Sequence, residues 1–110
     1  MNTAHTSNEE IMDLFRQCLP LFAALNDEKR QEIILIIAAA KEEGIMVNAI
    51  TEKVKLSRPA VSHHLKVLRQ TGIVGVKKNG VESYYYLTLL DSVKRFKELI
   101  AEIENSCILA

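Results

Sequence analysis

The chain has 110 residues, of which 48% are hydrophobic, so it can build one compact domain with a core and has little room for a second. No apolar run approaches the ~18 to 20 residues of a membrane span, and the first ten residues lack the basic-then-apolar order of a secretion signal. We therefore expect a single domain over residues 1–110, cytoplasmic and without a membrane role, whose two cysteines are reduced.

The formal net charge is zero, yet the charges are unevenly distributed. Residues 53–78 hold seven of the 14 Lys and Arg residues and no acidic residue, which leaves 7 basic against 14 acidic residues elsewhere. A basic segment in an acidic scaffold is expected when one surface contacts phosphate, although a solvated lysine face gives the same pattern.

Capping signals divide the first half of the chain into helices. Ser7 and Glu10 form a capping box, which predicts a helix over 7–19. Pro20 lacks a backbone N–H, so we expect this helix to end before it and a short second helix to follow. The isoleucine-rich segment after that predicts a central helix from Asp27 to about Glu43.

Residues 48–71 predict two helices joined by a short turn. Asn48 can cap the first helix, and Ser57 can cap the second, with Pro59 in its first turn and Gly72 at its end. Two helices joined in this way are the arrangement of helix-turn-helix DNA-binding proteins, in which the second helix is presented outward.

The second of these helices has two different sides. Val61, Leu65 and Leu68 recur at helical spacing and predict its buried face, while the opposite side carries only small, polar or basic side chains. Such a face can enter the major groove of DNA, although single charges there can also be ordinary solvated residues. His64 falls at the edge of the core, where packing or a local hydrogen bond is expected. The candidate DNA contacts are Ser57, Arg58, Pro59, Ser62, His63, Lys66 and Arg69.

Residues 73–87 predict a β-hairpin, a wing beside the two helices. Asn79-Gly80 is a strong hairpin signal, and taking it as the loop places Lys78 opposite Val81. Lys77 and Lys78 then lie near the exposed tip as candidate phosphate contacts. The face predicted to meet the core carries Val74, Val76, Tyr85 and Leu87.

A helix over 91–107 is predicted to end the fold. Its apolar residues recur at three- and four-residue steps, as in a coiled-coil seam: Val93, Phe96, Ile100, Ile103 and Cys107. A small domain rarely has two amphipathic end helices with nothing to cover them, so the helices over 7–19 and 91–107 are predicted to form a homodimer interface. Cys18 and Cys107 lie in these seams, either as small buried hydrophobes or as a redox or metalloid switch.

Three segments together resemble the ArsR/SmtB family of transcriptional repressors: LFAALNDEKRQEIILII, LSRPAVSHHLKVLRQTGIV and KKNGVESYYYL, within residues 21–87. The resemblance implies a mainly helical fold with a small hairpin, the winged helix-turn-helix, which dimerises through its first and last helices. It also implies a repressor that binds double-stranded DNA at a palindromic operator and is released by an inducer. Base reading would fall on Arg58, Pro59, Ser62 and His63.

The metal sites of that family are not matched. The Cys-x-Cys pattern of some members is replaced here by Met46-Val47-Asn48, which offers no thiolate. The metal pattern of the last helix would fall on Asp91, Val93, Glu104 and Cys107, without either imidazole that zinc prefers. We therefore expect no metal site and no cofactor, and the inducer stays unidentified.

Two other classes of protein were weighed against a DNA-binding regulator. A winged-helix module that has lost DNA binding and serves protein interaction would be favoured by an acidic residue on the exposed strip of the second helix, and none is there. An enzyme would need a nucleophile with a base, a Gly-rich phosphate loop or paired carboxylates in a pocket, and the sequence offers none.

Overall fold

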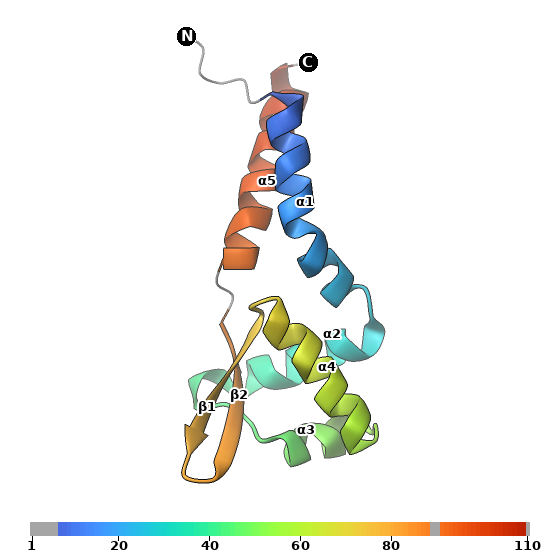
Figure 1. Ribbon diagram of the computed structural model, residues 1–110, viewed down its shortest axis with the longest axis vertical. Coiled ribbons are helices and arrows are strands. Elements are labelled where there is room, and N and C mark those ends of the chain that lie inside the picture. Colours follow the sequence, from blue (N-terminus) through green and yellow to red (C-terminus); the bar gives the residue numbers. More distant parts are fainter. Residues whose placement is uncertain (1–6, 89–90, 110) are drawn as a thin grey trace.

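The computed structural model describes residues 7–88 and 91–109, with side chains up to residue 106. The elements in chain order are α1 (Asn8–Leu25), α2 (Glu28–Ala39), the 3-10 turn η1 (Lys41–Glu43), α3 (Val47–Val54), α4 (Arg58–Gln70), β1 (Val74–Asn79), β2 (Glu82–Leu87) and α5 (Asp91–Leu109). Helices α2 to α4 and the hairpin form a body, and α1 and α5 lie side by side as an arm that extends from it (Figure 1). The predicted fold class, mainly helical with one small antiparallel hairpin, is confirmed.

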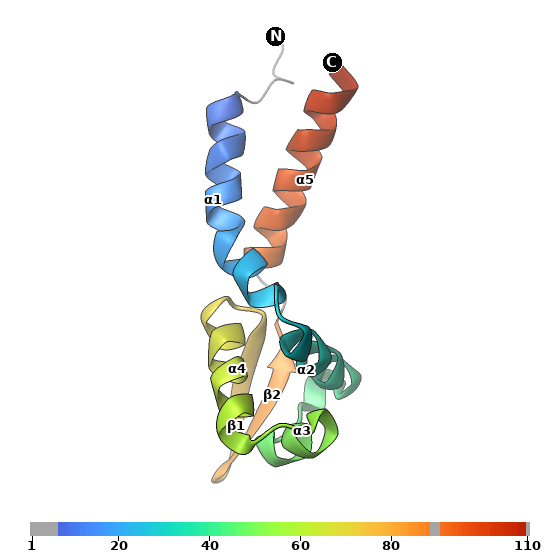
Figure 2. The same ribbon diagram turned by 90° about the vertical axis from the view of Figure 1, so that its right-hand side faces the viewer.

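The arm makes the molecule long. The molecule measures 56 × 25 × 19 Å, and its radius of gyration is 17.2 Å. A compact domain of this length has a radius of gyration of about 13 Å. Figure 2 shows the arm continuing along the long axis beyond the body, so that α1 and α5 contact each other over most of their length and the body only at one end. Much of the arm surface is therefore left uncovered by the chain itself.

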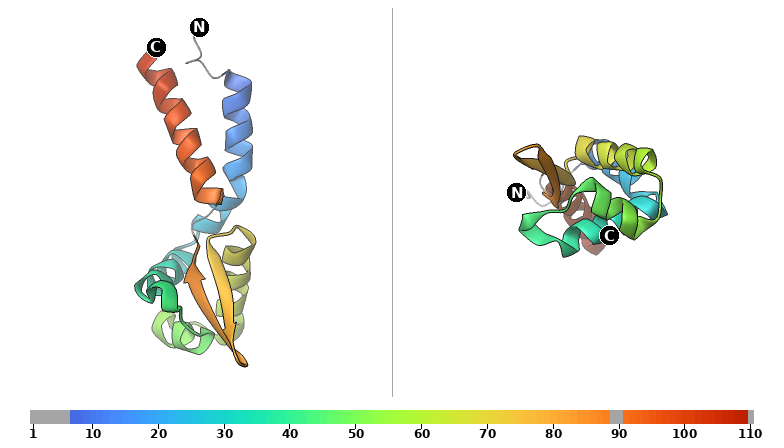
Figure 3. Two further views of the ribbon diagram at one scale, coloured as in Figure 1. Left: turned by 90° about the vertical axis from the view of Figure 1, so that its left-hand side faces the viewer. Right: turned by 90° about the horizontal axis from the view of Figure 1, so that it is seen from below.

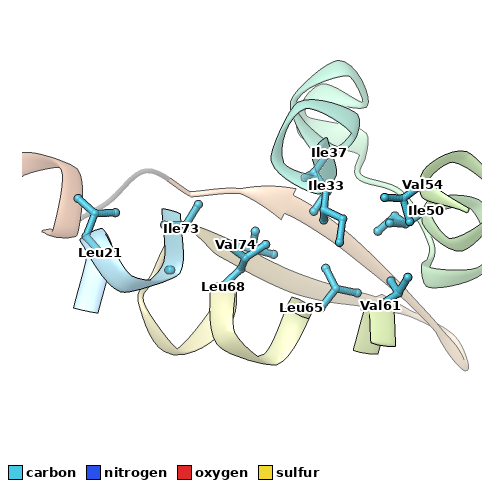
Figure 4. Close-up of a cluster of buried hydrophobic side chains, with 11 residues drawn as sticks. Leu21, Ile33, Ile37, Ile50, Val54, Val61, Leu65, Leu68, Ile73 and Val74 are labelled. Carbon is cyan, nitrogen blue, oxygen red and sulfur yellow. The ribbon is translucent and has the colours of Figure 1, made fainter. Parts of the chain in front are cut away.

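The body is held by one apolar cluster of buried side chains from α2, α3, α4 and the start of β1, joined by Leu21 from the end of α1 (Figure 4). Each helix supplies residues at helical spacing, which places them on one side. Their side chains are at most 3% exposed: Ile33 and Ile37 of α2, Ile50 and Val54 of α3, Val61, Leu65 and Leu68 of α4, and Val74 of β1. No polar side chain of the described residues is buried in this core, so the cluster itself is held by apolar packing.

A second, smaller cluster lies inside the arm. Ile11 and Cys18 of α1 are buried against Leu99 of α5, and the rings of Phe22 and Phe96 meet edge to face with centroids 5.7 Å apart. Charged residues lie on the outer sides of both helices. No helix within the described residues has the length and hydropathy to cross a membrane. The arm is thus an antiparallel pair made of the first and last helices of the described chain.

The predicted break at Pro20 is wrong, because α1 is one helix through Leu25. Cys18 before the proline and Leu21 after it are both buried, so packing against α5 and the body holds the helix across the missing N–H. Figure 1 shows the last turns of α1 leaning away from α5 toward the body, the bend expected where a proline removes a helical hydrogen bond.

Two further helix boundaries differ from the prediction. Helix α2 ends at Ala39 rather than near Glu43, because Lys41 takes a positive φ of 56° that an α-helix cannot contain. Helix α3 begins at Val47 without any side-chain cap, so the predicted cap at Asn48 is wrong. The backbone oxygen of Met46 accepts from the N–H groups of Ala49 and Ile50, at 3.1 and 3.2 Å.

Gly44 connects η1 to the sheet by a close approach. Its φ is +82°, and a Cβ there would lie 2.9 Å from the carbonyl oxygen of Tyr85, so only glycine fits. Ile45 then exchanges two backbone hydrogen bonds with Tyr85, at 2.9 and 2.8 Å. This isolated bridge covers the free edge of β2 at Tyr85.

The hairpin register differs from the prediction by two residues. Asn79 pairs with Glu82, so that Gly80 and Val81 form the loop and Lys77 lies opposite Tyr84. Asn79 therefore ends β1, and Gly80 alone takes a positive φ. A shift of two residues keeps every side chain on its face, and Val74, Tyr85 and Leu87 do pack on the core as predicted.

Candidate nucleic-acid interface

Helix α4 is presented by the predicted local signals. Ser57 is its N-cap, with its Oγ accepting from the backbone N–H of Ala60 at 3.3 Å, and Pro59 lies in the first turn. Val61 and Leu68 are 0% exposed and Leu65 is 2% exposed, so three side chains anchor one side of the helix in the core. The turn from α3 to α4 passes through Lys55 in the left-handed conformation, which closes α3 within one residue.

The other side of α4 is fully accessible. All seven residues of α4 and its cap that the sequence predicted as contacts are exposed: Ser57, Arg58, Pro59, Ser62, His63, Lys66 and Arg69. The helix has no acidic residue, and the charged side chains of Arg58, Lys66 and Arg69 make no ion pair with any part of the chain that the structure describes. Positive charge on this side is therefore available to an outside partner.

A groove of about 520 Å³ separates α4 from the hairpin. Ser62, Lys66 and Arg69 line one wall, and Tyr85 of β2 lines the other. Gln70 also borders this groove. Neither Gln70 nor Tyr85 was a predicted contact. The only sequence signal for Tyr85 was the strand alternation that turned it toward α4.

The structure separates the two lysines of the wing. Lys78 shares a face with Val74 and Val76, which is the face turned toward α4, whereas Lys77 lies on the opposite face. The Nζ atom of Lys77 donates to the backbone oxygen of Glu42 at 2.6 Å. Only Lys78 therefore extends the exposed basic surface of α4, and both lysines are exposed.

Arg30 joins three helices beside this surface. From α2, its Nε donates to the backbone oxygen of Ala24 at 2.6 Å and its Nη2 to that of Ala23 at 3.1 Å, so it caps the end of α1. Its Nη1 lies 3.3 Å from Nδ1 of His64 on α4 and 3.6 Å from Oδ2 of Asp27. The arm and α4 are thus connected through one guanidinium.

His64 is half-buried, as predicted for the edge of the core. Burial lowers the pKa of His64 below its ordinary value of 6.5, the carboxylate of Asp27 opposes this, and the positive charge of Arg30 adds to it. A neutral imidazole can accept from Arg30, whereas a protonated one cannot. The Arg30 contact therefore favours the neutral form.

Of the two cysteines, Cys18 has its side chain within the described residues. The Sγ of Cys18 belongs to a residue that is 1% exposed, and burial raises the pKa of this thiol. Cys107 lies in α5, but its side chain is outside the described residues, and so is any switch that depends on it. Among the described residues, no group of three or more His, Cys, Asp or Glu side chains is placed to hold a metal ion.

The arrangement defines the class of protein. Seen from the end opposite the arm, α3, α4 and the hairpin lie together at one end of the molecule (Figure 3, right). A short helix, a turn, a second helix anchored on one side only, and a hairpin beside it make a winged helix-turn-helix.

Comparison with known proteins gives the family. The sequence profile described as "Bacterial regulatory protein, arsR family" matches residues 27–76. An uncharacterised HTH-type transcriptional regulator of Methanocaldococcus jannaschii is 33% identical over 84% of this chain and 100% of its own length. The transcriptional repressor SmtB homolog of Synechocystis is 30% identical over 86% of this chain and 70% of its own. The chain belongs to the ArsR family of transcriptional regulators.

A solved structure agrees with the fold. The homodimeric winged helix-turn-helix DNA-binding domain of a possible ArsR-family regulator from Mycobacterium bovis superposes with a TM-score of 0.65 at 20% identity. The match covers 90% of this chain and 89% of that one, so it includes the arm as well as the body.

Proposed function

We propose that this protein is a homodimeric transcriptional repressor that binds a palindromic operator with α4 in the major groove. The observation that carries the proposal is the exposed side of α4, which bears basic and hydroxyl side chains and no acidic one, and whose charges form no ion pair with the described residues. Arg58 can bind guanine through two hydrogen bonds, while Ser62 and His63 can bond other base edges. Lys66, Arg69 and Lys78 then neutralise phosphates.

The arm supports the homodimer. Met12, Phe15 and Leu19 follow one another at three- and four-residue steps on α1 and are 49%, 36% and 56% exposed. Ile100 on α5 is 42% exposed as well. Helix α1 therefore has one apolar stripe against α5 and another in solvent, and a second copy of the arm would bury it. In such a dimer the two α4 helices would read half-sites about one turn of DNA apart.

The test begins by selecting bound fragments from the host genome and measuring their affinity by fluorescence anisotropy at several salt concentrations. Binding should weaken steeply with salt, by about 0.9 in log affinity per log salt for each phosphate contact. Arg58→Ala should reduce the preference for the selected fragment over random DNA. Lys29→Ala on α2 removes one positive charge from an exposed residue outside α4, the wing and the arm, and should change neither quantity.

The lysines of the wing sharpen this experiment. Lys78→Ala should weaken binding to all sequences about equally, because a phosphate contact carries no sequence information. Lys77 was predicted to do the same, but its side chain is bonded to Glu42 on the other face of the hairpin, so the effect of Lys77→Ala should be smaller. Absence of saturable DNA binding by the wild-type protein would refute the proposal.

Release by an inducer, through the cysteines or otherwise, stays a prediction. The burial of Cys18 and the raised pKa of its thiol favour a packing role over a switch, because the thiolate is the reactive form. Replacing Cys18 and Cys107 by Ser and measuring DNA release by oxidant or arsenite distinguishes the two roles. An unchanged response would eliminate the switch.

A further inference from the structure

An open hollow of about 850 Å³ lies on the side of the hairpin that faces away from α4. Its floor is apolar and comes from Ile37 and Ala38 of α2 and Leu87 of β2. Lys41 of η1 and Lys77 of β1 stand at its rim, and the ring of Tyr86 forms one wall. The volume falls within the range of roughly 300 to 1,000 Å³ that is usual for sites of small molecules.

The ammonium of Lys77 is held over this hollow. Its Nζ donates one hydrogen bond to the backbone oxygen of Glu42 at 2.6 Å and lies 5.8 Å from the centroid of the Tyr86 ring. A lysine has three donors, so two remain for a ligand. The lysine is therefore already positioned, and a ligand need not pay the entropy of ordering it.

Lys41 supplies a second cation without a partner. Its φ of 56° ends α2, as the similar φ of Lys55 ends α3. Its ammonium makes no hydrogen bond or ion pair with the described residues. Glu42 borders the same hollow, so the residues around it carry two positive charges and one negative charge. The rim therefore favours an anion.

The aromatic wall is held in place by a glycine. Gly75 lies opposite Tyr86 across the hairpin, and a Cβ at Gly75 would come within 2.9 Å of the ring carbon Cζ and 2.7 Å of Cγ2 of Thr88. The ring can lie flat across the strand only because Gly75 has no side chain. The hollow thus has a fixed aromatic surface beside an apolar floor.

We propose that this hollow binds a small organic anion with an apolar, aromatic body. The acid group would meet Lys41 and Lys77, and the body would lie on Ile37, Ala38 and the Tyr86 ring. The site is separate from the exposed face of α4. The hollow lies between α2, η1 and the wing, so a bound ligand would restrain the hairpin. Any change in DNA affinity that follows from this restraint rests on the function proposed above.

The test uses 8-anilinonaphthalene-1-sulfonate, an aromatic anion whose fluorescence rises in apolar surroundings, with the full chain at neutral pH and without DNA. Saturable binding of one probe per chain is expected. Lys41→Gln and Lys77→Gln should each weaken binding about tenfold, because each removes a charged hydrogen-bond donor. Lys97→Gln, an equal loss of charge on the arm, should have no effect.

A second variant tests the location without changing charge. Ala38→Trp fills the hollow from an exposed position of α2 and should abolish probe binding while the far-UV circular dichroism stays that of the wild type. Probe binding that survives Ala38→Trp and both lysine variants, or no saturable binding at all, would overturn the inference. A protein that binds the probe here but binds no DNA would support this inference and refute the proposed function.

Discussion

Replacing Arg30 tests whether one guanidinium holds the arm and α4 together. Its side chain is 13% exposed, and it donates to the backbone oxygens of Ala23 and Ala24 at the end of α1. Arg30→Met keeps most of the apolar stem and removes every one of these donors. The carbonyl oxygens, Nδ1 of His64 and the carboxylate of Asp27 then all lose the same partner.

The expected loss of stability follows from these contacts. A hydrogen bond to a charged group contributes about 1.5 to 3 kcal/mol. Ala24 is 0% exposed, so water cannot replace the hydrogen bond that its backbone oxygen loses. Ala23 is exposed, so water can bond to its oxygen instead. The 3.6 Å pair with Asp27 adds less than about 1 kcal/mol, so Arg30→Met should lower the free energy of unfolding by about 3 kcal/mol.

The assay is urea unfolding followed by circular dichroism at one fixed chain concentration, since dimer stability depends on concentration. Lys29→Met is the matched control, because Lys29 precedes Arg30 on α2 and makes only a surface pair with Glu32, at 3.1 Å with both side chains more than 40% exposed. It should cost at most about 0.5 kcal/mol. Equal losses for the two variants would refute the view that Arg30 joins the helices.

Three further results are expected. Phe15→Glu should shift the protein from dimer to monomer in sedimentation velocity while the circular dichroism is kept, and a dimer that persists would place the interface elsewhere. Ser57→Ala removes the N-cap of α4 and should cost about 1 kcal/mol in the same urea assay, with no loss if the 3.3 Å bond contributes nothing. Burial lowers the pKa of His64 in the folded protein below its unfolded value near 6.5; Arg30 and His63 also lower it, and Asp27 opposes them. The unfolded chain therefore binds the proton more readily than the folded chain. Stability should therefore fall as the pH drops below 6.5, and less so in His64→Gln; a fall of equal size would contradict this.

The parts of the fold that depend on neighbouring residues could be predicted from the sequence. Helix α4 was placed correctly because a cap, a proline in the first turn and three apolar residues at helical spacing all indicate the same segment. The hairpin was found from Asn79-Gly80, but the same dipeptide suggested the wrong loop, since Asn79 ends β1 instead. The sidedness of the strands was still right, because the error was an even number of residues.

The parts that depend on distant residues could not be predicted. The helix across Pro20 is kept by packing against α5 and the body, which outweighs a local signal to stop. The contacts of Arg30 join residues up to 34 positions apart, and two of them are backbone oxygens that no sequence pattern marks. The sequence predicted the same role for Lys77 and Lys78. The pleat of the strand places them on opposite faces, and Lys77 donates to the backbone oxygen of Glu42, which is distant in sequence.

The arm also sets the order in which the protein can be assembled on the ribosome. Helix α1 precedes the body in the chain and α5 follows it. Ile11 and Cys18 therefore cannot pack against Leu99 until all the residues between them have been synthesised. The apolar cluster of the body joins residues 21–87, and Phe96 of α5 packs against it, so the body too is complete only once α5 has been synthesised. If the arm forms the proposed dimer interface, pairing of subunits would then be among the last steps of biogenesis.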